Sequence, residues 1–280
     1  MHEGVTNMKV PILFEDNHLL LVEKPINIPV QEDSSGDKDL LNILKEDIKI
    51  RYEKPGKVYL GLVHRLDRPV GGAMVFAKTS KAGSRLSDML RRNTMERTYL
   101  AVVHGTPKNK KGELTDYLYK DRKKNQVYSV AKDHPEGKKA ILNYEVIESK
   151  DGFSLLSVSL QTGRSHQIRV QLATMGHPLY GDQKYGAKVN KAGQQIALWA
   201  HYLAFEHPVR KEPLAVKSWP PHEYPWDLWN KLNLILIINR KKVGLRCQKE
   251  QVERNEAKED VRMFLSCCFY WSASFLLLNM

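Results

Sequence analysis

The chain has 280 residues, enough to bury one sizeable core or a core divided into two lobes, and its 42% hydrophobic and 27% charged residues exclude a disordered protein. Forty-four Lys and Arg against 32 Asp and Glu leave a formal net charge of +12, which favours a polyanionic partner. All three cysteines lie after residue 246, so residues 1–230 have neither a disulfide framework nor thiolate metal ligands. The N-terminus has no apolar region of a secretory signal, and we expect a cytoplasmic protein.

The excess of positive charge is concentrated in one part of the chain. Residues 81–128 hold twelve Lys or Arg and five Asp or Glu, interleaved with Tyr99, Tyr117, Tyr119 and Tyr128. Basic residues mixed with aromatic rings suit RNA, because phosphates supply affinity and unstacked bases can lie on the rings. A solvated cationic face explains the same composition equally well.

The first elements are predicted from residues 12–79. Two strands flank a turn at Asp16-Asn17, and a helix begins after Asp39, with Leu40, Leu41, Leu44 and Ile48 at helical spacing. The stretch HRLDRPVGGAMVFAKT, residues 64–79, then joins two short strands, with Pro69 and the pair Gly71-Gly72 in the turn between them. Asp67 is therefore expected in a tight loop held by two strands, a position typical of reacting side chains, although a solvated surface acid is the simpler interpretation.

The middle of the chain alternates helix and strand signals. Ser80 is expected to cap a helix, and residues 96–105 form a strand with Tyr99, Ala101 and Val103 on one face. The segments that carry Asp67 and Tyr99 are expected to be neighbours in one sheet.

The next segments are a hairpin, a short helix and a further strand. The hairpin covers residues 140–160 and turns at Asp151-Gly152. The short helix has Ser165 as its cap and Arg164 at the strand-to-helix junction, and the strand follows in residues 196–208.

Most familiar catalytic motifs are absent from the sequence. It contains no GxxxxGK[ST], no GxGxxG that opens a helix and no GxSxG, and its histidines lack the spacing of metal ligands. A single carboxylate near arginines remains. Glycoside hydrolysis normally needs two carboxylates, and the second candidate, Asp182 in YGDQKYG, has an easy structural interpretation as a loop stabiliser. One acid with one arginine suits a reaction that retains its leaving group and needs no water.

Several ordered blocks resemble one family. HRLDRPVGGAMVFAKT, ERTYLAVVHG, LQTGRSHQIRV and GHPLYGDQKYG are similar, in this order and spacing, to blocks of the RluA family of RNA pseudouridine synthases. ILFEDNHLLLVEKP and ALWAHYLAFEHP resemble the opening and late blocks, so the similarity covers roughly residues 10–228. The resemblance implies an α+β fold with a mixed, mainly antiparallel sheet, flanking helices and a central catalytic cleft.

The resemblance also implies an activity and a site. A member of the family isomerises uridine in ribosomal or transfer RNA to pseudouridine, with no cofactor and no metal. Asp67 is then the catalytic aspartate, either attacking the sugar or removing a sugar proton, and Arg164 its ion-pair partner. Tyr99 is expected against the uracil, with its hydroxyl helping to remove the C5 proton. The expected substrate-binding residues are Arg65, which holds the flipped nucleotide, Ile168 in the pocket wall, His64 and Arg169.

The chain departs from the family pattern in two respects. RPVGG follows the aspartate where a small hydroxyl residue is more common before the second glycine, and we expect no separate RNA-binding domain before Ile12. We expect a catalytic domain over residues 1–230, a tail of unknown role over 231–280, no membrane association of the catalytic body and a monomer. A catalytically silent RNA-binding protein with the same fold and a carboxylate-dependent nucleoside or glycoside hydrolase are the alternatives.

Overall fold

A computed structural model describes residues 9–229 of the chain. All of the elements named below belong to the first of two compact units, Met1–Leu228 and Trp229–Met280. In chain order the elements are β1 (Ile12–Glu15), β2 (Leu19–Lys24), α1 (Leu40–Arg51), β3 (Gly61–Leu62), β4 (Gly71–Ala77), α2 (Ser80–Arg91), β5 (Glu96–His104), β6 (Lys111–Asp121), β7 (Gln126–Val130), β8 (Lys138–Lys150), β9 (Phe153–Leu160), α3 (Gln167–Thr174), β10 (Leu198–Glu206), β11 (Pro213–Lys217) and a final 3-10 turn (Trp226–Leu228).

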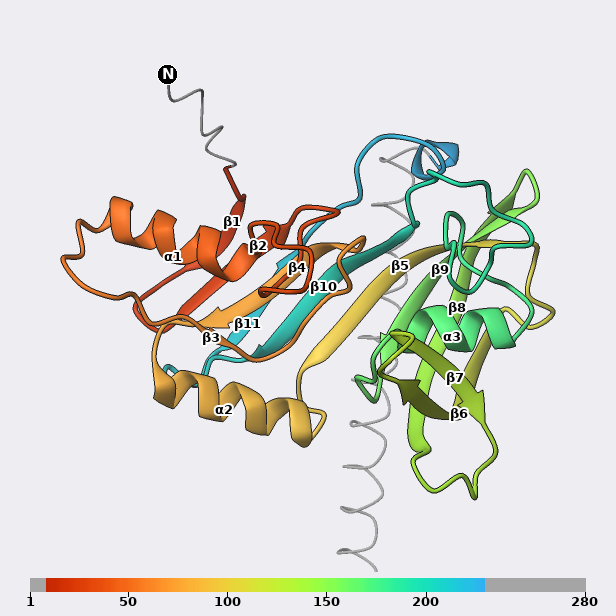
Figure 1. Ribbon diagram of the computed structural model, residues 1–280, viewed down its shortest axis with the longest axis horizontal. Helices are drawn as coiled ribbons and strands as arrows, with labels where there is room; N and C mark the ends of the chain where they lie inside the picture. The colour runs from red at the N-terminus through yellow and green to blue at the C-terminus, as the bar shows by residue number, and fades with distance from the viewer. Residues whose placement is uncertain (1–8, 230–280) are drawn as a thin grey trace, which may run out of the picture. The chain divides into compact units, whose positions relative to one another are not determined.

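The strands form one sheet of eleven, in the order β1-β2-β4-β10-β5-β9-β8-β6-β7, with β3 on β4 and β11 on β10 (Figure 1). Among the described strands only β4 and β10 pair in parallel. The sheet is thus mixed and mainly antiparallel with flanking helices, which confirms the predicted fold class. The predicted boundary at residue 230 stays a prediction, because the tail lies outside the described residues. None of the helices among residues 9–229 is long and apolar enough to cross a membrane.

The two faces of the sheet are covered by different helices. Successive side chains of a strand point to opposite faces, and β2 shows this clearly: Leu20 and Val22 pack with α1, whereas Leu19 and Leu21 pack with α2. The buried residues of β5 that share the α1 face are Tyr99, Ala101 and Val103, as predicted from their alternation. The same apolar cluster includes Ile168 and Leu172 of α3, so α1 and α3 lie on the same face.

The start of α1 is as predicted, and the starts of α2 and α3 each differ by one residue from the prediction. Asp39 caps α1 as expected, accepting a hydrogen bond from the Asn42 N–H at 3.1 Å. Thr79, not Ser80, caps α2, because Thr79 has the extended backbone that a cap requires (φ −137°) and Ser80 is already helical. Ser165 does not cap α3; His166 occupies that position in a left-handed conformation (φ 51°, ψ 20°).

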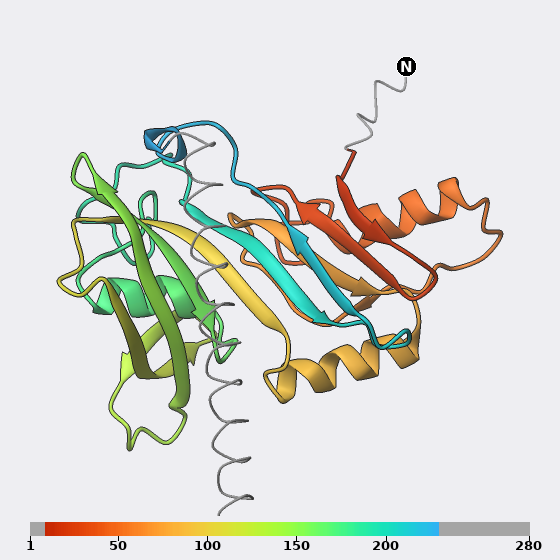
Figure 2. The same cartoon turned by 180° about the vertical axis from the view of Figure 1, so that it is seen from behind.

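Strand β10 occupies the middle of the sheet, where β4 and β5 were expected to be neighbours. β10 runs between β4 and β5 (Figure 2). Ala200 of β10 pairs with Gly72 of β4 on one side and with Tyr99 of β5 on the other. The glycines read as part of a turn belong to β4. Gly72 has φ +116°, and a Cβ at this position would lie 2.3 Å from the Ala200 carbonyl oxygen, so the close approach of the two strands requires glycine.

A hairpin that was not predicted extends the sheet beyond β8. β6 pairs with β8 and turns into β7 at residues 122–125, which are exposed. α3 packs against this part of the sheet through Val170, which belongs to one apolar cluster with Leu118 of β6 and Val127 of β7. The hairpin is thereby fixed beside the start of α3, where the candidate site lies.

Candidate active site

Asp67 lies in the loop between β3 and β4, and the backbone on both sides of it is fixed. The Asp67 carbonyl oxygen accepts a hydrogen bond from the Val70 N–H at 2.9 Å, which closes a turn. The ammonium of Lys24, fully buried, donates to the carbonyl oxygens of Arg68 and Val70 at 2.9 and 2.8 Å. Three quarters of the Asp67 side chain is shielded from solvent, and the rest faces a pocket. The loop therefore holds a partly exposed carboxylate on a rigid base.

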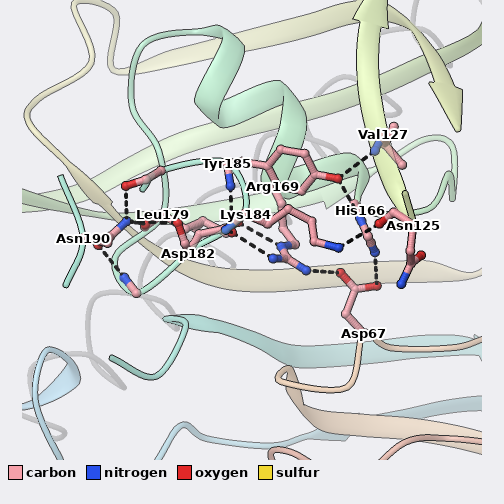
Figure 3. Close-up of polar contacts among 12 residues, drawn as sticks. Asp67, Asn125, Val127, His166, Arg169, Leu179, Asp182, Lys184, Tyr185 and Asn190 are labelled. Atoms are coloured by element: carbon pink, nitrogen blue, oxygen red, sulfur yellow. Dashed lines mark hydrogen bonds and ion pairs between the residues drawn. The ribbon is translucent and has the colours of Figure 1, made fainter. Parts of the chain in front are cut away.

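The ion-pair partner of Asp67 is Arg169 of α3. Its Nη1 donates to Asp67 Oδ2 at 3.2 Å, while its Nε and Nη2 donate to the two oxygens of Asp182 at 2.9 and 2.8 Å. Figure 3 shows the guanidinium between the two carboxylates. Burial opposes the charge of Arg169, but the hydrogen bonds and charges of Asp182 and Asp67 raise the pKa of Arg169 above its usual value. The arginine is therefore a permanent cation that orients one oxygen of Asp67.

The expected pair between Asp67 and Arg164 is wrong. The Nε of Arg164 donates to the Lys139 carbonyl oxygen at 3.0 Å, although Arg164 still lines the pocket. The reason is the phase of α3. His166 and Arg169 are three residues apart at the start of the helix and share one face, which points to Asp67, whereas Arg164 precedes the helix. Arg169 was expected only as a substrate-binding residue.

Asp182 is more than a loop stabiliser. Its side chain is 1% exposed, and its Oδ1 accepts the N–H groups of Lys184 and Tyr185 at 3.0 and 3.1 Å in addition to the Arg169 contacts. A buried carboxylate needs such partners to remain charged. Asp182 thus fixes the guanidinium that Asp67 contacts.

The remaining expected residues also lie around this pocket. Tyr99, 7% exposed, and Ile168, 5% exposed, form part of its wall, and the exposed Arg65 lies at its rim. Burial raises the pKa of Tyr99; the charge of Arg97 opposes this shift and the charge of Asp67 adds to it, so the phenol stays protonated at neutral pH. The structure brings Asp67, Tyr99 and Arg169 together; their catalytic roles stay predictions.

His64 lines the same pocket, but its ring has a structural contact. The Nε2 atom accepts the Val75 N–H at 3.1 Å, tying the loop to β4. Burial lowers the pKa of His64 to about 4, and the charge of Arg97 adds to the effect, so the ring is neutral. Because Nε2 is occupied, the predicted contact of His64 with the substrate would have to use another part of the ring.

Two pocket residues were missed from the sequence. Arg97 lines the same pocket as Asp67, and its buried Nε has no hydrogen-bond partner. His166 lies between Asp67 and Tyr185, with its Nε2 atom 3.9 Å from Asp67 Oδ1. Alternation in β5 could have indicated Arg97, which shares a face with Tyr99 two residues later. Among residues 9–229, no group of three or more His, Cys, Asp or Glu is arranged to hold a metal ion.

The comparison with known families identifies the class of protein. The family model for RNA pseudouridylate synthase matches residues 18–174, a range that includes Asp67, Tyr99 and Arg169. The chain therefore belongs to the RNA pseudouridylate synthase family, whose members are isomerases that act on RNA. This result confirms the RluA-type resemblance of the sequence blocks.

Similar proteins cover most of the chain. An uncharacterized RNA pseudouridine synthase of Bacillus subtilis is 36% identical over 225 residues, which cover 79% of this chain and 71% of that protein. The ribosomal large subunit pseudouridine synthase D of Zymomonas mobilis is 31% identical over 249 residues, 85% of this chain and 77% of the relative. The structure of human RNA pseudouridylate synthase domain containing 4 matches with a TM-score of 0.65 at 21% identity, covering 78% of this chain and 91% of the human one.

Proposed function

We propose that this pseudouridine synthase acts on ribosomal RNA, with Asp67 as the catalytic carboxylate, Arg169 as its ion-pair partner and Tyr99 as the side chain that meets the uracil. The contact that carries the proposal is the 3.2 Å hydrogen bond between Arg169 and Asp67 at the edge of a pocket that Tyr99 lines. The relatives named ribosomal large subunit pseudouridine synthase support ribosomal RNA as the substrate.

The site suits a reaction in which the bond from uracil N1 to the ribose breaks, the base turns, and C5 joins the ribose. The Asp67 carboxylate is held by the Arg169 guanidinium, and in the proposal it either attacks the sugar carbon or accepts a sugar proton. Both possibilities use the oxygen that Arg169 leaves unbound. The neutral phenol of Tyr99 and the apolar Ile168 provide a surface for the uracil ring.

Arginines around the pocket provide the contacts for the phosphates. Arg65, Arg97 and Arg164 line it together with the Asp67–Arg169 pair. An enzyme that works on a base inside folded RNA has to extrude the nucleotide, and cations at the mouth of the pocket hold the displaced backbone. Arg164, displaced from its expected pairing, is assigned to this backbone contact.

The basic β6–β7 hairpin supplies a second RNA contact. Its turn carries Arg122, Lys123 and Lys124, which are exposed, and Lys184 near the site donates to the Asn125 carbonyl oxygen at 2.7 Å (Figure 3). Positive charge therefore continues from the pocket to the hairpin. We assign selection of the target RNA to this surface. The proposal also includes that the protein is a monomer and acts in the cytoplasm.

Modification mapping tests the proposal directly. The protein is incubated separately with ribosomal and transfer RNA from a strain that lacks the gene, and pseudouridine is mapped by carbodiimide-blocked primer extension. New sites in ribosomal RNA, with unchanged RNA mass and no free base, are expected. New sites only in transfer RNA would refute the substrate, and binding without modification would favour a silent RNA-binding protein.

The role of Asp67 is tested in the same assay. Asp67→Asn preserves the shape of the side chain but removes its charge, so we expect no detectable turnover and little change in RNA affinity. Turnover at the wild-type rate would exclude Asp67 as the catalytic carboxylate.

A further inference from the structure

His166 adopts an unusual conformation that points its ring at the catalytic carboxylate. It is the residue before the first turn of α3, and its left-handed backbone costs roughly 1 kcal/mol for a residue other than glycine. At this helix position a side chain normally accepts a backbone N–H, but the His166 side chain makes no such bond. Its ring instead lies between Asp67 and Tyr185, which indicates that the conformation serves the site (Figure 3).

The contacts of Tyr185 determine which ring nitrogen of His166 carries the proton. The Val127 N–H donates to the Tyr185 hydroxyl oxygen at 2.9 Å, and the hydroxyl lies 2.7 Å from His166 Nδ1. Burial raises the pKa of Tyr185 to about 12, so its hydroxyl keeps its proton and donates it to Nδ1. The proton of the neutral imidazole is therefore on Nε2, the atom that faces Asp67.

The charges around His166 favour this neutral form. Burial lowers the pKa of His166; Asp67 opposes this shift, whereas Arg169, Lys184 and Lys120 add to it. The ring thus presents an uncharged N–H to Asp67 Oδ1. The 3.9 Å separation is too long for a hydrogen bond in the free protein, but catalytic contacts often tighten when substrate binds.

The two oxygens of Asp67 consequently have different neighbours. Arg169 holds Oδ2 at 3.2 Å, and the Nε2–H of His166 faces Oδ1. We propose that His166 is a positioning residue, which orients the second oxygen of Asp67 toward the ribose when RNA enters the pocket, and that Tyr185 fixes the ring in the required tautomer. The proposal rests on the catalytic role of Asp67.

The same contacts link Asp67 to the hairpin that faces RNA. Val127, which donates to Tyr185, is in β7, immediately after the basic turn of residues 122–125. RNA bound at this turn would therefore lie next to the strand whose backbone N–H holds the Tyr185 hydroxyl.

A matched pair of substitutions tests the role of His166. His166→Gln places an amide N–H where Nε2 was, whereas the shorter side chain of His166→Asn retains an acceptor for Tyr185 but cannot reach Asp67. Asparagine tolerates the left-handed backbone better than glutamine, so a purely structural role predicts the better enzyme from His166→Asn. The proposal predicts the opposite: kcat falls about tenfold in His166→Asn, the scale of one lost hydrogen bond to a charged group, and is largely restored in His166→Gln.

The assay measures kcat and KM separately on in-vitro-transcribed large-subunit ribosomal RNA. KM is expected to stay near that of the wild type in both variants, because the proposed role of His166 is to orient Asp67 and not to bind RNA. Tyr185→Phe should lower kcat like His166→Asn. Tyr180→Phe is the control, since its hydroxyl accepts from Gln194 at 2.9 Å and makes no contact with His166.

The outcomes separate this inference from the proposed function. Equal kcat values for the two His166 variants, or a change in KM alone, would overturn the positioning role. Asp67→Asn is run in parallel. If Asp67→Asn is inactive and His166→Asn turns over normally, the inference fails and the proposed function stands; if Asp67→Asn is active, the proposed function itself fails.

Discussion

Replacing Arg169 by lysine separates the observed ion pair from the one expected from the sequence. The guanidinium makes three hydrogen bonds to two carboxylates, at 3.2, 2.9 and 2.8 Å. An ammonium is a single point of charge and cannot reproduce this geometry. Asp182, which is 1% exposed, then loses its two-pronged partner and keeps only backbone donors. We therefore expect Arg169→Lys to lower the free energy of unfolding by about 3 kcal/mol, which is the low end of the range for breaking a buried ion pair.

The activity of the same variant follows from the third hydrogen bond. A bond between two charged groups contributes about 1.5–3 kcal/mol, so its loss lowers kcat by roughly 10- to 150-fold if Asp67 must be oriented in the transition state. Single-turnover rates on ribosomal RNA and urea denaturation measure the two effects. The matched control is Arg164→Lys, whose kcat should stay close to that of the wild type because Arg164 bonds the Lys139 carbonyl and not Asp67; loss of its proposed phosphate contact should change KM instead. A normal kcat in Arg169→Lys, with a slow Arg164→Lys, would refute the assignment.

Three further predictions concern groups around the site. Burial lowers the pKa of Lys24 from 10.5 to about 7. Between pH 7 and pH 10.5 the unfolded chain therefore binds one more proton than the folded protein, so stability rises with pH. Relative to Lys24→Met, the free energy of unfolding should rise by about 2 kcal/mol from pH 7 to 9. Urea denaturation that shows a constant difference would exclude the shift. Gly163→Ala places a Cβ 2.8 Å from Arg97 Nη1 and so displaces the guanidinium. RNA affinity, measured by fluorescence anisotropy, should fall while the melting temperature stays the same. Unchanged affinity would show that Arg97 does not contact RNA. Gly72→Ala should lower the free energy of unfolding by about 3 kcal/mol or more, because its Cβ meets the Ala200 carbonyl, and an unchanged urea midpoint would contradict that clash.

Local features of the fold followed from the sequence where a short-range rule decides them. The alternation in β5 placed Tyr99 on the correct face, and Asp39 was recognised as a cap because the helical spacing of leucines begins beside it. The order of strands is a long-range property, and no local pattern reveals that β10 separates β4 from β5. The hairpin β6–β7 was missed because few residues of its strands are buried and β6 is rich in charged residues.

The sequence predicted which segments form the site, but not which side chains contact one another within it. Asp67 and Tyr99 were identified, and they line one pocket. The choice between Arg164 and Arg169 depends on which side chain the first turn of α3 directs at Asp67, and the match of sequence blocks alone assigned the pair to the wrong arginine. The contacts of His166 arise from a backbone conformation that the sequence does not specify on its own.

The central position of β10 has a consequence for when the enzyme becomes competent. Residues 198–206 are among the last of the body to leave the ribosome, yet they bond both to the strand after Asp67 and to the strand that carries Tyr99. A nascent chain that ends before them has two half-sheets with unpaired edges, and such distant pairings form slowly. Synthesis of the body must therefore be nearly finished before the carboxylate and the tyrosine share one cavity, and an incomplete chain has no means of modifying the RNA that surrounds it.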